Sequence, residues 1–167
     1  MWKLFRSSST PGNHDLVQNV LIASEGRRFS QEAIDLAVSI LNAQDGRVTV
    51  LTVARLWGTA LGFPNPGLRP SKREMDEQKD NVSWALARLE EAGVSANGHI
   101  VTTRNPTKSI LNEAKRRKCD AIVMGADPRR SWFVRNFMWS QEPYRVSART
   151  RMPIHLVCPG EISNVRQ

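Results

Sequence analysis

The sequence predicts a single α/β domain, a doubly wound parallel sheet with helices on both faces. Short apolar, β-branched segments alternate along the chain with longer segments whose apolar residues recur at helical spacing. The apolar segments lack the alternation of a half-exposed strand, which is typical of strands buried on both faces of a parallel sheet. A chain of 167 residues has the length of one domain.

The first half of the chain is predicted to run strand, helix, strand, long loop, helix. Residues 56–71 hold three glycines and three prolines, which excludes regular structure there. Ser30 is a suitable N-cap for the first helix, and Gly93 is a suitable stop for the second. The predicted elements are a strand at 17–24, a helix at 30–43, a strand at 47–55 and a helix at 72–92.

The second half continues the alternation. Asn105 followed by Pro106 predicts the start of a third helix, which ends in the basic run 115–118. Residues 126–139 are rich in arginine and aromatic residues and are predicted to be an irregular loop, after which Ser140 caps a fourth helix. The predicted strands of this half lie at 97–103, 120–125 and 154–157.

The ends of the chain are predicted to be tails, at 1–15 and 161–167, around a domain at 16–160. No apolar run is long enough to span a bilayer or to form the core of a secretory signal, so we expect a cytoplasmic protein and no membrane partner. Cys119 and Cys158 stand at opposite ends of two neighbouring strands, which predicts two free thiols. The three histidines are dispersed, and we expect no metal site.

Charge is distributed unevenly along the chain. The net charge is +8; residues 1–103 hold 11 basic and 11 acidic side chains, and residues 104–167 hold 13 and 5. This excess permits an anionic partner, but it is also compatible with an ordinary solvated face. Because no nucleic-acid-reading module is recognisable, the charge predicts at most weak, salt-sensitive binding to nucleic acid.

Three segments together resemble the universal stress protein family. They are VLIASEG at the first strand, NPTKSILNEAKRRKCDAIVMGA at the third helix and fourth strand, and RMPIHLVCP at the fifth strand. The resemblance implies a five-stranded parallel sheet in the order 3-2-1-4-5. It also implies a homodimer formed by the last strand, through Ile154, His155, Leu156 and Val157.

In one branch of this family a nucleotide lies at the ends of strands one and four, where the switch-point rule also places a ligand. The family's aspartate that would contact the ribose corresponds to Glu25. ATP or AMP is the cofactor that such a cleft would take. The nucleotide-site residues implied in this sequence are Ala23, Ser24, Glu25, Val53, Met124, Gly125, Asp127, Arg129, Arg130 and Ser140.

The phosphate loop departs from the pattern of that branch, which is Gly-x2-Gly-x9-Gly-(Ser/Thr). Gly125 fills the first position, but Pro128, Met138 and Trp139 stand at the other three, and Ser140 supplies a hydroxyl only with a shift of one residue. Proline has no amide to donate to phosphate, and the larger side chains fill the space. We therefore expect a binding or regulatory module that is not a strong ATP binder and has no cofactor.

Alternatives stay open. Arg129, Arg130 and Arg135 could replace the missing amides with guanidinium groups, which would give an adenine-nucleotide site with slow hydrolysis or none. The loop could also have no role. No catalytic residue is predicted, because the chain has neither a G-x-S-x-G elbow nor a Walker loop. A surface of Trp57, Trp132 and Trp139 could meet a protein partner.

Overall fold

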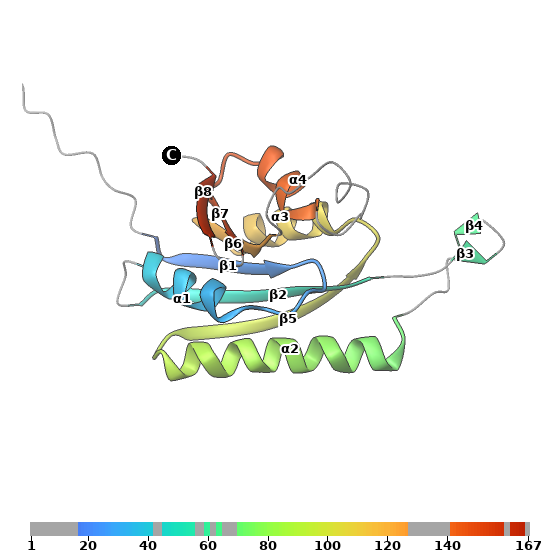
Figure 1. Ribbon diagram of the computed structural model, residues 1–167, viewed down its shortest axis with the longest axis horizontal. Helices are drawn as coiled ribbons and strands as arrows, with labels where there is room; N and C mark the ends of the chain where they lie inside the picture. The colour runs from blue at the N-terminus through green and yellow to red at the C-terminus, as the bar shows by residue number, and fades with distance from the viewer. Residues whose placement is uncertain are drawn as a thin grey trace, which may run out of the picture.

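The structure is a computed structural model that describes residues 17–41, 45–55, 59–60, 63–64, 70–126, 141–158 and 161–165. Its main sheet has six strands in the order β5-β2-β1-β6-β7-β8. The first five are parallel, and β8 pairs antiparallel with β7 (Figure 1). Since β1, β2, β5, β6 and β7 are the five predicted strands, the α/β class and the order 3-2-1-4-5 are confirmed.

The elements follow the predicted alternation closely. The strands of the main sheet are β1 (Asn19–Ser24), β2 (Arg47–Arg55), β5 (Ser95–Thr103), β6 (Ala121–Gly125), β7 (Ile154–Cys158) and β8 (Glu161–Val165). The helices are α1 (Gln31–Ile40), α2 (Lys72–Glu91), α3 (Pro106–Arg116) and α4 (Glu142–Ala148). Two-residue strands β3 (Thr59–Ala60) and β4 (Phe63–Pro64) form a separate small sheet.

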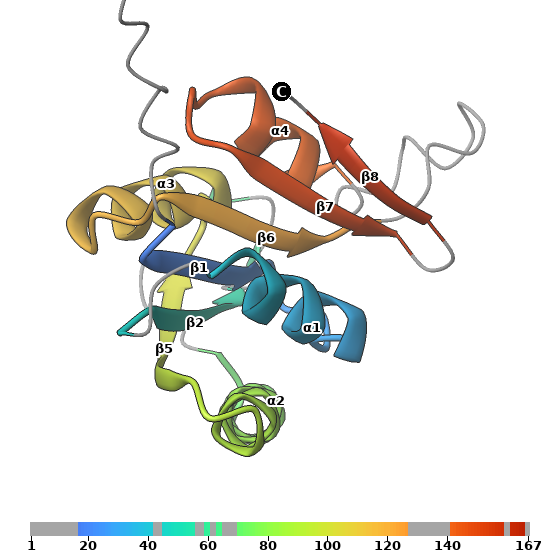
Figure 2. The same ribbon diagram turned by 90° about the vertical axis from the view of Figure 1, so that its left-hand side faces the viewer.

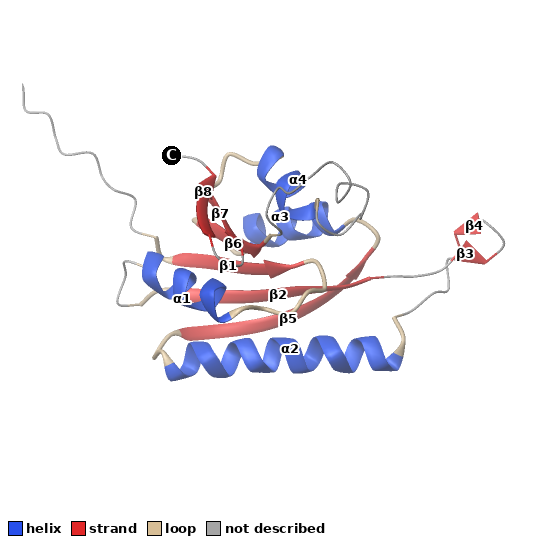
Figure 3. Cartoon of the chain, viewed as in Figure 1, coloured by secondary structure: helices blue, strands red, loops and turns tan. Residues whose placement is uncertain are grey.

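The helices cover both faces of the sheet, as a doubly wound fold requires (Figures 2 and 3). On one face, Ala33, Ile34 and Ala37 of α1 pack over β1 and β6, and Val82, Ala85 and Leu89 of α2 pack over β2 and β5. On the other face, residues of α3 and α4 such as Ile110 and Val146 pack on β1, β6 and β7. The strands are therefore buried from both sides, which is why they are apolar without alternation.

The helix ends explain where each helix begins and stops. The side chains of Ser30, Ser71 and Asn105 accept backbone N–H groups at the starts of α1, α2 and α3. At the other end, α2 and α3 are each followed by a residue with left-handed backbone: Gly93 (φ +73°) after α2 and Lys118 (φ +52°) after α3. The two caps share one geometry but differ in side chain.

Four local features differ from the prediction, and the first is the N-cap of α4, which is Gln141 rather than Ser140. β5 begins at Ser95, two residues early, and the short β3–β4 pair lies in the segment expected to lack regular structure. β8 occupies residues that were assigned to a C-terminal tail; it extends the sheet by pairing antiparallel with β7. The expected N-terminal tail at 1–15 and most of the 126–139 loop lie outside the described residues. Among the described residues, no helix has the length and apolar character needed to cross a membrane.

Candidate functional site

A pocket lies at the carboxyl ends of β1 and β6, beside the amino end of α1. Its volume is about 200 Å³. β1 connects onward to β2 on one side and pairs with β6 on the other, so this is the point where the strand order reverses and where doubly wound sheets bind ligands. The pocket is lined by Ala23, Ser24, Glu25, Arg27, Arg28, Phe29, Ser30, Glu32, Ala33, Gly125, Ala126 and Val157.

The loop that follows β1 forms one wall of the pocket and is held by side chains at both ends. The Ser24 hydroxyl donates to the Arg27 carbonyl (2.6 Å) and accepts from the Gly26 amide (3.1 Å). Asn81 of α2 accepts from the Phe29 amide (2.9 Å) and donates to the Arg27 carbonyl (2.7 Å). Side chains from the loop and from α2 therefore hold the backbone of this loop in place.

Gln78, one turn before Asn81, ties the same loop to the sheet. Its amide nitrogen donates to the Gly26 carbonyl (3.2 Å), and its amide oxygen accepts from the Thr52 hydroxyl on β2 (2.5 Å). Gln78, Asn81 and Thr52 are all buried, so each unmade bond would leave a polar group without water. The network connects β2, α2 and the pocket loop in one rigid unit.

Glu25 is the charged group at the base of the pocket. It is 1% exposed, and its carboxylate forms an ion pair with Arg27, with Oε1 2.5 Å from Nε. The Arg27 side chain is itself largely covered, at 28% exposure. A buried carboxylate with a cation this close is already neutralised inside the protein. The negative charge of Glu25 is therefore balanced within the protein by the Arg27 guanidinium.

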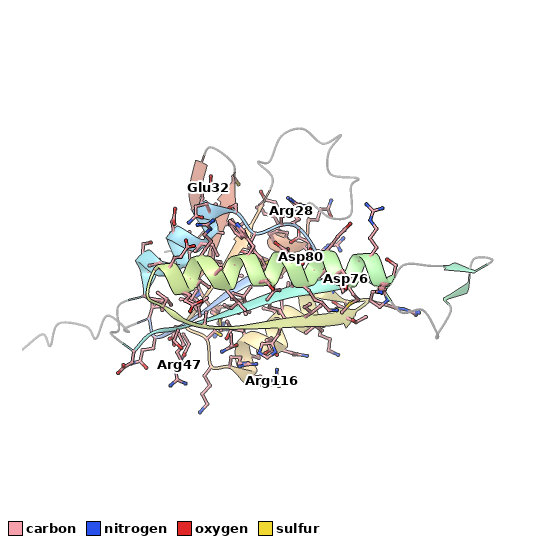
Figure 4. The ribbon with its side chains drawn as sticks, turned by 90° about the horizontal axis from the view of Figure 1, so that it is seen from below. Arg28, Glu32, Arg47, Asp76, Asp80 and Arg116 are labelled. Atoms are coloured by element: carbon pink, nitrogen blue, oxygen red, sulfur yellow. The ribbon has the colours of Figure 1, made fainter. Side chains whose placement is uncertain are left out.

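The remaining polar groups of the pocket are mixed in sign. Arg28 and Glu32 are exposed, and Figure 4 shows both on the α1 side of the molecule. Ser30 and the first amides of α1 supply N–H and O–H donors. At Gly125 an added Cβ would meet no described atom within 4 Å, so the space beside the end of β6 is open. The pocket offers donors for a small anionic group but is smaller than the roughly 300–1,000 Å³ of drug-sized ligand sites.

The predicted nucleotide-site residues divide into three groups. Ala23, Ser24, Glu25 and Gly125 line the pocket together. Val53 and Met124 are fully buried in the core under α3 and α4 and do not line it. Asp127, Arg129, Arg130 and Ser140, as well as Pro128, Arg135 and Met138, lie outside the described residues.

Sequence reasoning missed two kinds of residue at this site. Arg27 and Arg28 line the pocket and follow the first strand directly, a position at the carboxyl edge that could have identified them. Gln78 and Asn81 hold the loop; their signal was two amides on the otherwise apolar face of the second helix. A polar residue at a buried helical position requires a partner, but the sequence does not name that partner.

Other predicted surfaces are placed as follows. Ile154, His155, Leu156 and Val157 lie on β7, and their backbone pairs with β6 on one side and β8 on the other. The β7 edge expected to join a second chain is thus paired within the molecule. Trp57, Trp132 and Trp139 lie outside the described residues.

The two cysteines are free and buried, as predicted. Burial and the neighbouring Asp120 carboxylate raise the pKa of the Cys119 thiol to about 11, which keeps it protonated at neutral pH. No group of three or more His, Cys, Asp or Glu residues suited to a metal ion occurs in the described part of the chain.

Comparison with known proteins identifies the fold. The sequence model of the universal stress protein family matches residues 17–153. A universal stress protein from Burkholderia pseudomallei is similar in structure, with a TM-score of 0.60 at 18% identity, covering 86% of this chain and 97% of that one. No curated protein sequence matches the chain at a significant level.

Two further similar structures contain nucleotides. One is the universal stress protein from Archaeoglobus fulgidus in complex with dAMP, with a TM-score of 0.59, 18% identity and coverage of 86% of this chain and 98% of that one. The other is a universal stress protein family protein from Arabidopsis thaliana with AMP bound, with a TM-score of 0.53, 16% identity and coverage of 86% and 92%. At these identities the likeness concerns the fold alone.

Proposed function

Because the chain belongs to the universal stress protein family, we propose that it is a binding and regulatory module whose pocket does not hold ATP tightly. The observation that carries this proposal is the buried ion pair between Glu25 and Arg27. The acid that the family resemblance assigns to the ribose is engaged inside the protein. Drawing it toward a ligand would weaken this ion pair inside the protein, which costs binding free energy.

Pocket size and loop chemistry support the same proposal. The space among the described residues is about 200 Å³, small for a nucleoside triphosphate. In the sequence, Pro128 and Met138 replace two glycines of the phosphate loop, which removes one amide donor and adds bulk. A triphosphate would therefore find one backbone donor fewer and less space.

A second candidate is an adenine mononucleotide site. Arg28 is exposed at the pocket, and Ser30 and the amino end of α1 lie beside it. One phosphate needs few donors, and a guanidinium group can bind it through two hydrogen bonds. Similar structures that contain dAMP and AMP favour this ligand class.

The remaining functional expectations belong to this proposal. We propose a cytoplasmic, non-enzymatic role with at most slow ATP hydrolysis, since the sequence has no nucleophile or phosphate-positioning motif. Dimerisation through Ile154–Val157 is proposed only for molecules in which β8 has left β7, because β8 pairs with that edge.

Thermal unfolding with ATP and with AMP tests the proposal. We expect no shift in Tm at millimolar ATP, whereas a site filled at 100 times its Kd would stabilise the fold by about 2.7 kcal/mol. Release of ATP from the purified, denatured protein, or a clear shift with ATP, would contradict the first candidate.

AMP separates the two candidates. If AMP alone raises Tm, Arg28→Ala should remove the shift, because Arg28 is the exposed cation of the pocket. Arg149→Ala is the matched control, since Arg149 is also exposed but follows α4 and does not line the pocket. An AMP shift that both variants retain would place the nucleotide elsewhere and sink the second candidate.

A further inference from the structure

A row of cations lies along the amino-terminal edge of the sheet, opposite the pocket. In a parallel sheet the starts of the strands share one edge, so residues just before β2, β6 and β7 gather there. Lys115, Arg116 and Lys118 end α3 and precede β6, Arg47 begins β2, and Arg151 precedes β7. All five are exposed. We call Arg47, Lys115, Arg116, Lys118 and Arg151 the amino-edge patch.

The spacing of the patch follows from strand register. Arg47 pairs with Asn19 on β1, and the Asn19 side-chain amide donates to the Lys118 carbonyl (3.4 Å), so the turn that carries Lys118 lies beside the start of β1. Strands lie about 4.8 Å apart, which places Arg47 and this turn roughly 10 Å from each other. Figure 4 shows Arg47 and Arg116 on the face of the sheet that carries α3, and Arg28 and Glu32 on the opposite, α1 side.

Among the described residues, an ion pair engages Arg116 of the patch and none engages its other four cations. Asp120, the nearest carboxylate in sequence, accepts the backbone amides of Gln18 and Asn19 at 2.8 and 2.9 Å. Glu113 is buried and holds Arg116 and Arg117. Asp45 stands two residues before Arg47, and Glu90 and Glu91 lie at the end of α2 beyond the patch. Among the described residues, no ion pair engages Arg47, Lys115, Lys118 or Arg151.

Lys118 carries a second, independent sign of function. It occupies the left-handed position after α3, with the Cys119 amide donating to the Ala114 carbonyl (2.9 Å). α2 ends in the same way, with the Val94 amide donating to the Leu89 carbonyl, but there the left-handed residue is Gly93. Glycine adopts this backbone freely, whereas lysine does so at a cost in free energy. The chain thus keeps a cation where local backbone preference favours glycine.

From these observations we propose that the amino-edge patch binds the phosphodiester backbone of nucleic acid without reading sequence. Backbone phosphates need only cations and N–H donors at suitable spacing, and the rigid turn supplies both. At this edge the described large apolar residues include Val17, Val94 and Met152, which are partly buried against the core. A protein interface is anchored by apolar or aromatic residues, and a membrane-bound surface inserts them, so phosphate is the partner chemistry that fits.

The salt dependence of binding to a fluorescein-labelled 20-base-pair duplex measures the number of contacts. With four unpaired cations engaged, log K should fall against log salt with a slope of about −3.6, so affinity drops roughly a hundredfold between 50 and 200 mM NaCl. Affinity should be equal for duplexes of unrelated sequence. A strong preference for one sequence would contradict backbone binding.

Lys118→Gly is the decisive variant, because it removes the charge and relaxes the backbone together. We expect Tm to stay equal or to rise, while the slope becomes shallower by about 0.9 and affinity falls about eightfold at 0.1 M salt. The matched control is Lys108→Gln, which removes the same charge from the exposed, opposite end of α3. It should change affinity less than twofold.

Competition distinguishes the other anionic partners. Polyglutamate and phosphatidylserine vesicles, added at the same charge concentration, should displace the duplex only weakly. Displacement by either one at equal charge would assign the patch to acidic protein or to membrane and overturn the proposal. Equal loss of affinity in the Lys118 and Lys108 variants would show that binding depends only on net charge, which also overturns the proposal.

Discussion

Asn81 shows how one buried amide can organise a site from a distance. It lies on the sheet-facing side of α2, 52 positions after Phe29, yet it accepts from the Phe29 amide and donates to the Arg27 carbonyl. The buried Phe29 amide finds its acceptor in this side chain, and the Arg27 carbonyl accepts from Asn81 as well as from the Ser24 hydroxyl. The shape of the pocket wall therefore depends on a residue that does not line the pocket.

Asn81→Ala should destabilise the fold by about 1–3 kcal/mol, because the buried Phe29 amide loses its acceptor and the Arg27 carbonyl loses one of its two donors. Urea unfolding measures the change in free energy. Ser83→Ala, on the exposed side of the same helix, should change stability by less than about 0.5 kcal/mol. Equal stabilities for the two variants would show that water satisfies the loop.

At the residue scale, local rules predicted what local chemistry decides. Ser30 and Asn105 were identified as caps because a hydroxyl or amide oxygen just before an apolar-periodic segment can accept a free N–H group of the first helical turn. Gln78 and Arg28 were missed because their roles depend on partners from other elements. The residue type shows that these side chains are polar, but only the fold shows which groups they contact.

The end of α3 is held by an ion-pair network that reaches β5. Glu113, 8% exposed, contacts Arg116 (2.7 Å) and Arg117 (2.9 Å), and Arg117 also donates to Asn97 of β5 and contacts His99. Burial alone would raise the pKa of Glu113, but the hydrogen bonds from Arg116 and Arg117 lower it overall. Burial and the Arg117 and Arg116 charges lower the pKa of His99, against the opposing charge of Glu113.

Both shifts predict loss of stability in acid. A group whose pKa is lower in the folded state favours unfolding once it is protonated. For His99 this begins as pH falls below its ordinary value of 6.5, and for Glu113 as pH falls below 4.5. The free energy of unfolding should therefore decline in two stages, measured by urea titration from pH 8 to pH 3.

Two variants assign the stages. His99→Gln should remove the first stage, so its stability relative to the natural chain should improve as pH falls below 6.5. Glu113→Gln should cost about 1–3 kcal/mol at pH 7, and this difference should shrink in acid below 4.5. Curves parallel to that of the natural chain at every pH would show that neither group is linked to folding.

At the element scale, apolar runs and caps predicted the nine main elements, but not β8. Its sequence, EISNV, is short and half polar, and it follows Pro159 and Gly160, which together are typical of a chain leaving a sheet. Its strand conformation comes from antiparallel pairing with β7, a tertiary interaction. Edge strands of this kind are weakly encoded because one side lacks a partner.

Across the whole molecule, the parallel sheet separates two surfaces. The pocket lies at the carboxyl edge, where Glu25 and Arg27 largely cancel, and the amino-edge patch lies at the start of the strands. The two can therefore be tested independently, since a substitution in the patch stands a strand length, roughly 16–20 Å, from the pocket. Failure at one edge would leave the argument for the other intact.

The sheet also has an edge that the chain closes itself. β8 pairs with β7 from Ile154↔Val165 to Cys158↔Glu161, so every residue of β7 is opposed within the molecule. Unpaired strand edges attract further strands, and an intramolecular strand prevents this. The family resemblance assigns dimerisation to this edge of β7, so β8 should act as its competitor.

Deleting residues 159–167 should therefore shift the chain from monomer to dimer, as measured by light scattering at micromolar concentration. Ser163→Pro tests the same point in the full-length chain: Ser163 is opposite Leu156, and a proline in β8 removes a backbone donor there. Removal of residues 1–9, an equal length from the other terminus, is the control and should leave the mass unchanged. A dimeric full-length chain with a monomeric truncated chain would show that the contact runs through β8 itself. If both are monomers, the β7 edge does not self-associate, and the proposed dimerisation through Ile154–Val157 must be abandoned.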